Sequence, residues 1–332
     1  MATFDRNILL RLGDEHKKLM CLIRDNINSM KSDKELYKFI DAYLASNNLN
    51  RAFPIGISIN SIIAHDSYHK DNKRYFKEGD LIKVDIGLEE YGNIIDSART
   101  YEYVSDINQE AIEDCKEIVR LTEEFIRKEY KKNNKIKVQA ISTVIYFHIV
   151  KKGYHALDYL GGHNIEYGRV HGKKLILNKP LTHLPSGCQS FVNKTDELGE
   201  GEMFAIEVFI PDKKNTNKID INGKMIQNIT LPITHYELNR DTINEYDKLT
   251  EREIEVLKDL EEMTKLLPYE YITHEKYDKY IIKSLIEKEK IIKHLPLEWI
   301  DYYYENEKRD IKYIQYEDCF LIEKEEILNL SK

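Results

Sequence analysis

Two apolar segments on either side of a short turn each carry one aspartate, and this pair constrains the fold more than any other feature. Residues 81–100 have the sequence LIKVDIGLEEYGNIIDSART, which predicts two strands joined by a turn at residues 90–92, with Asp85 and Asp96 11 residues apart. In an antiparallel hairpin centred near residue 90 or 91 their side chains fall almost opposite each other. Aspartate is depleted in strands, and facing like charges destabilise a strand pair. Unless one of the two is exposed at the hairpin end, the carboxylates need a raised pKa or a cation between them.

A glycine-rich segment with two histidines is the second unusual feature. Residues 161–172 have the sequence GGHNIEYGRVHG, so four of the 14 glycines of the chain surround His163 and His171. Glycine permits close approach of the backbone to a ligand. The segment is therefore either a ligand-binding loop or a glycine-rich loop whose histidines have no special role. The histidines without such a context are interpreted as isolated residues: His16, His69, His148, His183, His274 and His294.

Single glutamates interrupt two further apolar segments, Glu207 in MFAIEVFI and Glu317 in YIQYEDCFLI. An ionised glutamate in a strand buried on both faces is costly unless it is paired or binds a metal, so each is a core acid, a salt-bridge partner or a ligand. The resulting candidate set has four carboxylates, one imidazole and no thiolate: Asp85, Asp96, His163, Glu207 and Glu317. Such a set suits two divalent ions (Mn²⁺, Fe²⁺, Co²⁺ or Zn²⁺) bridged by carboxylates, the arrangement of two-metal hydrolysis.

Composition limits the class of protein. A chain of 332 residues buries roughly three quarters of its unfolded surface, so it needs no disulfide or metal to hold a core. The net charge of −8 argues against a sequence-independent grip on nucleic-acid phosphates, and no specific nucleic-acid partner is expected. The four cysteines are scattered, and no apolar stretch has the length of a signal peptide or a membrane span. We expect a cytoplasmic monomer without a membrane partner.

The pattern along the chain predicts one α+β domain over residues 1–332. Apolar residues at helical spacing predict the helices, one of which has a candidate N-cap at Ser32. Short apolar runs bounded by glycine and aspartate predict the strands. Helices are expected at 7–30, 33–47, 106–132, 136–152, 248–267 and 274–292, strands at 53–103 and from 311, and a mixture at 155–235. The last two helices would form an insertion at 239–305. Their charge runs are interpreted as a solvated face, with docking on a ribosome left open.

The order and spacing of these motifs resemble the methionine aminopeptidases, and more closely their type 2 branch. The matching segments are AFPIGISINSIIAH at 52–65, IKVDIG at 82–87, IIDSART at 94–100, GHNIEYGRVHGK at 162–173, FAIEVF at 204–209, THYEL at 234–238 and QYE at 315–317. The resemblance implies the pita-bread fold, in which helices cover a central antiparallel sheet with pseudo-twofold symmetry. Glu207 and Glu317 are 110 residues apart with two predicted helices between them, which matches the helical insertion of type 2.

The resemblance also implies roles for the metal ligands. Asp85 would bind one ion, and His163 and Glu207 would bind the other. Asp96 and Glu317 would bridge the two ions, which would be Co, Mn, Fe or Zn. Glu207 would in addition accept a proton and pass it to the leaving amine.

Substrate-side roles follow from the same resemblance. His65 and His171 would contact the scissile peptide and its developing oxyanion, and His235 would lie near the substrate side chain. A pocket for methionine would have apolar walls at positions matching Phe53, Val170 and Phe209. The implied activity is hydrolytic removal of the initiator methionine from nascent or newly made proteins, with a preference for a small second residue.

Four positions depart from the family's pattern, namely Arg99, Gly161, Asp318 and Cys319, and none of them removes a metal ligand. Two other functions remain open: a non-catalytic pita-bread relative that binds RNA or ribosomes, and a proline-directed peptidase on the same fold. The first is expected to lose ligands and to carry a basic C-terminal extension, and the second to add an N-terminal domain. Because all five ligand types are present and the chain has neither extra feature, we expect the aminopeptidase.

Overall fold

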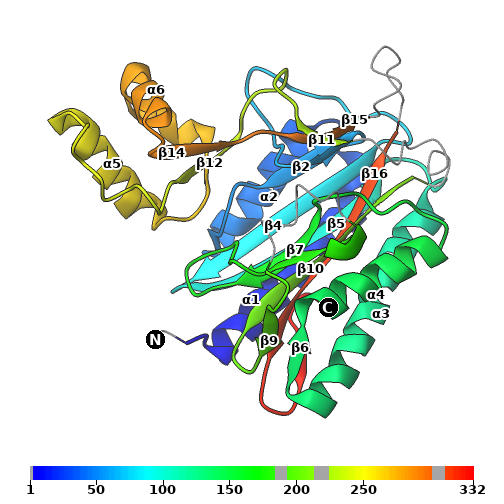
Figure 1. Cartoon of the computed structure of the whole chain (residues 1–332). Coiled ribbons are helices and arrows are strands. Elements are labelled where there is room, and N and C mark those ends of the chain that lie inside the picture. The colour runs from blue at the N-terminus through cyan, green and yellow to red at the C-terminus, as the bar shows by residue number, and fades with distance from the viewer. Residues whose placement is uncertain (1–2, 184–192, 213–223, 301–310) are drawn as a thin grey trace.

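The structure is a computed structural model that describes residues 3–183, 193–212, 224–300 and 311–332 (Figure 1). Two helices begin the chain. α1 (Arg6–Asn26) is capped by the Asp5 side chain and continues into the 3-10 turn η1 (Ile27–Ser29), and α2 (Asp33–Ser46) is capped by the Ser32 side chain. Both N-terminal helices and the Ser32 cap are confirmed, because amphipathic spacing and cap chemistry are local properties of a sequence.

The predicted hairpin is confirmed and forms the centre of the first antiparallel sheet. Its strands, β4 (Leu81–Glu90) and β5 (Asn93–Glu102), are joined by Tyr91 and Gly92, whose φ values of 48° and 80° suit a two-residue hairpin turn. The strands β1 (Asn50–Arg51) and β2 (Gly56–Ile59) pair with the other edge of β4. Asp85 lies opposite Ala98, two residues beyond Asp96. The carboxylates are therefore diagonal neighbours on one face instead of direct partners, because the turn is centred between residues 91 and 92.

The second sheet has five strands in the order β17-β16-β10-β7-β8. They are β7 (Gly161–Ile165), β8 (Leu175–Leu177), β10 (Met203–Pro211), β16 (Tyr313–Ile322) and β17 (Ile327–Asn329). β10 and β16 are antiparallel, with Glu207 directly opposite Glu317. The two sheets meet at β5 and β16, where Ser97 Oγ donates to the Glu317 carbonyl at 2.6 Å. Thr100 Oγ1 donates to the Gln315 carbonyl at 2.8 Å, so this seam aligns strands that carry acids from both sheets.

Helices cover this double sheet in pairs (Figure 1). α3 (Gln109–Asn133) and α4 (Val138–Lys151) pack on β10 and β16 around a core that includes Ile118 and Phe204. α1 and α2 pack on β4 and β5 around a core that includes Leu12 and Val84. Burial of each such side chain contributes roughly 1.5–3 kcal/mol, so the two cores hold the halves of the sheet rigidly. The helices expected at 106–132 and 136–152 are confirmed.

A helical unit with its own small core lies between β10 and β16 in the sequence. The strand β12 (His235–Leu238) pairs with β13 (Tyr269–Glu270) and β14 (Ile291–His294). These strands pack with α5 (Glu251–Thr264) and α6 (Lys279–Glu287) around Leu238, Leu257 and Leu285. The helix expected at 274–292 is only partly right, because the 3-10 helix η5 (Tyr271–Lys276) precedes α6 and residues 291–294 pair with β12 as a strand. Residues 301–305 of the expected insertion lie outside the described residues.

Short elements complete the described structure: β3 (Ile62–Ala64) and β11 (Lys224–Gln227), which flank β15 (Leu297–Ile300), then β6 (Lys135–Lys137) paired with β9 (Glu197–Gly199), and the 3-10 turn η2 (Leu181–His183). The strand-like C-terminal stretch is confirmed as β16 and β17. Within the described ranges, no helix is both long and apolar enough to cross a membrane.

Candidate metal centre

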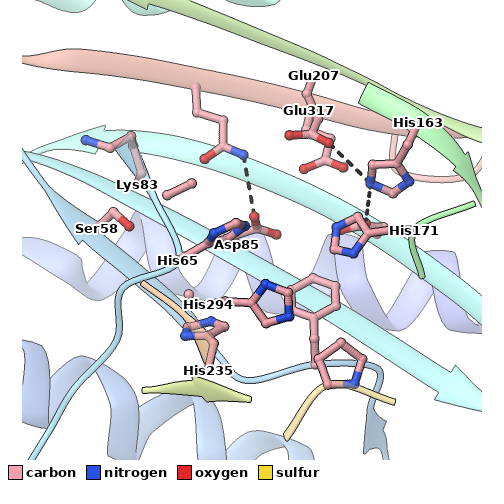
Figure 2. A pocket seen from close by; sticks show the side chains of 16 residues that line it. Ser58, His65, Lys83, Asp85, His163, His171, Glu207, His235, His294 and Glu317 are labelled. Carbon is pink, nitrogen blue, oxygen red and sulfur yellow. Dashed lines mark hydrogen bonds and ion pairs between the residues drawn. The ribbon is translucent and has the colours of Figure 1, made fainter. Parts of the chain in front are cut away.

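Five strands bring the predicted ligands into one cavity (Figure 2). In the order β4, β5, β7, β10 and β16 they contribute Asp85, Asp96, His163, Glu207 and Glu317. Potential ligand atoms of Asp96, His163 and Glu317 lie within 4.8 Å of one another, and all three residues are buried. His163 Nε2 is 3.3 Å from Glu207 Oε1 and 3.5 Å from Asp96 Oδ2. All five residues selected from the sequence therefore converge.

Two of the carboxylates lack the hydrogen bonds that buried oxygens need. Among the described residues, both side-chain oxygens of Glu317 and Oδ1 of Asp85 are buried without a partner. The other Asp85 oxygen is 3.5 Å from Gln315 Nε2. Burial, followed by the charges of the neighbouring carboxylates, raises the pKa of Asp85 and of Glu317 well above the usual range. Such a cluster is stable only when protons or cations neutralise it.

His163 brings a positive charge into this cluster. Burial by itself lowers the pKa of an imidazole, but the hydrogen bonds of His163 with Asp96 and Glu207 outweigh burial and raise its pKa to about 10. Burial also raises the pKa of Glu207, although His163 opposes this shift. Because only a neutral imidazole is a metal ligand, binding of a metal at His163 requires the loss of this proton.

Three further predicted residues, His65, His171 and His235, line the same cavity. Burial, together with the charge of His294, lowers the pKa of His65 to about 3. The pKa values of His171 and His235 are also well below the usual range, because both rings lie deep in the fold beside other histidines. All three rings are therefore neutral at pH 7 and each keeps one N–H donor. His65 has a φ of 60°, in the left-handed region that non-glycine residues adopt uncommonly.

The three predicted apolar positions separate in the structure. Phe53 lines the cavity. Val170 and Phe209 are 2% and 1% exposed, belong to hydrophobic clusters and are not among the residues of the cavity wall. A sequence cannot distinguish a wall residue from one in the layer behind it, because both positions are apolar.

The interpretation of His294 as an isolated residue is wrong. Its side chain lines the cavity, with its ring centre 5.6 Å from that of His65. The pairing of β12 with β14 sets His294 directly opposite His235, although the two are 59 residues apart in the chain. No local pattern could reveal this proximity, since it depends on how the helical unit folds back.

Lys83 and Gln315 also line the cavity and were not selected from the sequence. Each lies two residues before a predicted ligand in a strand and therefore on the same face, which is a signal that could have found both. Lys83 is 1% exposed, and its Nζ donates to the Asn60 carbonyl at 3.0 Å and to the Tyr313 carbonyl at 3.1 Å. Burial lowers its pKa to about 7.

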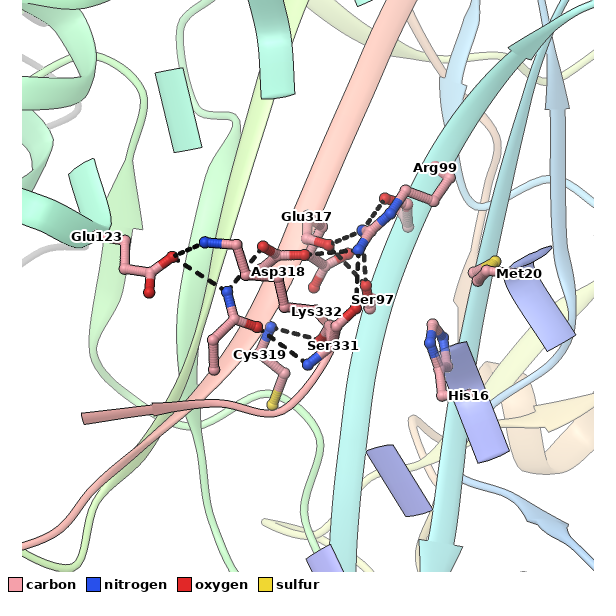
Figure 3. Close-up of polar contacts among 12 residues, drawn as sticks. His16, Met20, Ser97, Arg99, Glu123, Glu317, Asp318, Cys319, Ser331 and Lys332 are labelled. Carbon is pink, nitrogen blue, oxygen red and sulfur yellow. Dashed lines mark hydrogen bonds and ion pairs between the residues drawn. The ribbon is translucent and has the colours of Figure 1, made fainter. Parts of the chain in front are cut away.

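Two departures from the family's pattern form a buried ion pair behind the cavity (Figure 3). Arg99 Nη2 is 2.7 Å from Asp318 Oδ1, and the two side chains are 15% and 5% exposed. The same guanidinium donates to the Ser331 carbonyl at 3.1 Å and to the Glu317 carbonyl. It also lies 4.1 Å from the ring centre of Tyr316. Arg99 thus connects β5 to the strand that carries Glu317 through an ion pair, backbone hydrogen bonds and contact with an aromatic ring.

The other two departures are structural. Gly161 has a φ of 151°, and a Cβ there would lie 2.3 Å from the Ile176 carbonyl oxygen, so no larger residue fits. Cys319 is fully buried, and burial raises the pKa of its thiol, which keeps it protonated and unreactive.

Comparison with known sequences gives a consistent assignment. The model of metallopeptidase family M24 matches residues 9–231. A methionine aminopeptidase from Thermococcus onnurineus is 28% identical over 214 residues, which cover 62% of this chain and 64% of that protein. A methionine aminopeptidase 2 from Malassezia globosa is 26% identical over 223 residues, which cover 62% of this chain and 46% of that protein. The alignments thus span less than two thirds of these relatives.

Solved structures show the fold. A methionine aminopeptidase from Thermotoga maritima superposes with a TM-score of 0.61 at 14% identity and covers 100% of this chain and 99% of that one. A thermophilic Arx1 superposes with a TM-score of 0.67 at 11% identity and covers 98% and 91%. Identities this low say nothing of activity, but the superpositions confirm the expected pita-bread architecture with antiparallel sheets and covering helices.

Proposed function

This chain belongs to metallopeptidase family M24, and on that basis we propose that it is a metal-dependent aminopeptidase of the methionine aminopeptidase kind. One observation carries the proposal: four carboxylates and an imidazole converge beside three neutral histidines in one cavity. The name of the Thermococcus relative supports methionine as the residue released. The helical unit and the match to a methionine aminopeptidase 2 support the type 2 branch, with one catalytic domain over residues 1–332 and an insertion at 239–305.

The side chains in the cavity fit divalent ions. Buried oxygens of Asp85 and Glu317 lack partners among the described residues, and the donor set is oxygen-rich without thiolate, which suits Co, Mn, Fe or Zn. Two such ions would be held by the five converging residues. Bound ions of this kind supply a water of lowered pKa and polarise a carbonyl group.

The chain's own groups perform the proton transfer and the positioning. Glu207 accepts the proton of the attacking water and returns it to the leaving amine, a role for which its carboxylate lies among the proposed metal ligands in the cavity wall. His171 donates a hydrogen bond to the carbonyl oxygen as negative charge develops on it, and His65 contacts the scissile peptide beside it. Their depressed pKa values keep both rings neutral, so they add no positive charge that would compete with the ions for the carboxylates.

The substrate enters with its free amine toward the carboxylates and its first side chain beside Phe53 and His235. The resemblance to methionine aminopeptidases supports a small second residue in the peptide. The substrates are newly made proteins that begin with methionine, and the protein acts on them in the cytoplasm as a monomer.

Purified protein supplied with Mn²⁺ or Co²⁺ should release methionine from a Met-Ala-Ser peptide, measured by chromatography of the products. Asp96→Asn should reduce turnover at least about a hundredfold and weaken metal binding in calorimetry, because it removes a proposed metal ligand. The exposed Asp106→Asn is the matched control and should change neither. Absence of methionine release with all four metals contradicts the proposal, as does full activity of Asp96→Asn. Binding of RNA or ribosomes without any turnover would instead favour the non-catalytic relative.

A further inference from the structure

The cavity has a fourth substrate-side imidazole, His294, at the end of β14. Figure 2 shows it on the same side of the cavity as His65 and His235, away from Glu317. The ring centres of His65 and His294 are 5.6 Å apart and nearly perpendicular, at 70°. The metal centre and the predicted histidines leave this ring without an assigned role.

Glu237 fixes the orientation of the His294 ring. Glu237 lies two residues after His235 on β12 and therefore on the same face of this small sheet. His294 Nε2 is 3.2 Å from Glu237 Oε2. Because a carboxylate oxygen accepts the hydrogen bond, Nε2 carries the ring hydrogen and donates a hydrogen bond to Glu237. Nδ1 is then the free edge of the ring, and no hydrogen bond to it is found within the described ranges.

His294 also lies where a peptide leaves the cavity. Its side chain is 26% exposed and that of Glu237 is 19% exposed, whereas the metal-side His163 and Asp96 side chains are 4% and 5% exposed. In the proposed mode of binding, with the peptide amine near the carboxylates, the second residue of the peptide comes next to His294. The cavity wall offers it the His294 imidazole as a hydrogen-bonding group.

We propose that His294, oriented by Glu237, hydrogen-bonds the side chain of the second residue of the peptide and selects a hydroxyl there, serine or threonine, over alanine. This inference rests on the proposed aminopeptidase function and specifies its substrate class. Nδ1 accepts a hydrogen bond from the hydroxyl when the ring is neutral and donates a hydrogen bond to the hydroxyl oxygen when the ring is protonated. One such hydrogen bond, strengthened by the carboxylate behind the ring, gives a preference of about tenfold.

The test compares Met-Ser-Gly with Met-Ala-Gly in both turnover and binding. The wild-type protein should show a kcat/KM about tenfold higher for the serine peptide. His294→Phe keeps a planar ring but removes both nitrogens, so it should abolish this preference: the ratio of kcat/KM for the serine peptide to that for the alanine peptide should fall to about one. Glu237→Gln should reduce the preference partially, because the ring loses its fixed orientation. His274→Ala, a histidine of the same helical unit that faces a separate groove, is the control and should keep the preference.

Peptide binding to a Glu207→Gln background, measured by calorimetry, separates this inference from the proposed function. The inference would be supported if the serine peptide bound about tenfold more tightly than the alanine peptide and His294→Phe removed this difference. This support would hold even if the wild-type protein released no methionine. Equal binding and equal kcat/KM of the two peptides in the wild-type protein would overturn it. A serine preference that survives in His294→Phe would overturn it as well.

Discussion

The ion pair of Arg99 with Asp318 allows a quantitative test of how this chain holds the strand that bears Glu317. Asp318→Ala would leave the Arg99 guanidinium, whose side chain is only 15% exposed, without its carboxylate. The remaining hydrogen-bond partners are neutral and compensate only part of the loss; they are the carbonyls of Ser331, Glu317 and Ala98 and the hydroxyl of Ser97. Removing one member of a buried ion pair costs about 3–5 kcal/mol of unfolding free energy, because the other charge stays buried and unpaired.

This free energy converts into a measurable shift of the melting temperature. At roughly 2.1 cal/mol/K per residue, a chain of 332 residues has an unfolding entropy of about 0.7 kcal/mol/K. A loss of about 3–5 kcal/mol therefore lowers Tm by about 4–7 °C, which differential scanning calorimetry resolves. The double variant Arg99→Met with Asp318→Leu should lose clearly less than Asp318→Ala, because it removes both charges and fills the space with apolar side chains.

Two results would refute this reasoning. If Asp318→Ala lowered Tm by less than about 1 °C, the ion pair would contribute as little to the unfolding free energy as solvent-exposed ion pairs usually do. A double variant that loses as much as the sum of its two single changes would mean that the side chains act independently. Glu287→Ala, which removes an exposed partner of Lys283, is the control and should leave Tm nearly unchanged.

Two further predictions concern buried positions. Burial and the charge of Arg99 lower the pKa of His16 to about 3, so the folded protein keeps this ring neutral. The unfolding free energy of the wild-type protein, measured by urea titration relative to His16→Gln, should therefore fall by about 2 kcal/mol as the pH drops from 7 to 5. A stability difference that does not change with pH would contradict the burial of a neutral His16. Gly161→Asn should destabilise the protein by roughly 1–3 kcal/mol, because its Cβ would meet the Ile176 carbonyl. Gly153→Ala, at a position with open space and a φ of 85°, should cost only about 1 kcal/mol. Equal losses in the two glycine variants would show that backbone conformation, and not the close contact, decides.

The acidic side chains that line the cavity could be predicted from local sequence to an unusual degree. Asp85, Asp96, Glu207 and Glu317 each interrupt an apolar strand, and an acid in such a position is costly enough to require a special partner. The N-terminal helices and the hairpin turn were predictable for a similar reason, since caps, amphipathic spacing and turn residues act within a few positions of each other. The expected position of Asp85 almost opposite Asp96 was not correct: the turn is centred one residue later than expected, so Asp85 pairs with Ala98.

The sequence by itself determined which acids are candidates for the cavity, because a charge inside an apolar run is visible without knowledge of the fold. Only the tertiary structure decided which distant residues meet. The register of β10 on β16 sets Glu207 opposite Glu317, and the pairing of β12 with β14 brings His294 beside His235. Where β5 and β16 meet, two residues that depart from the family's pattern, Arg99 and Asp318, form an ion pair. These contacts join residues from about 60 to over 200 positions apart, and the free energy that selects them comes from burying the whole sheet under its helices, not from any local signal.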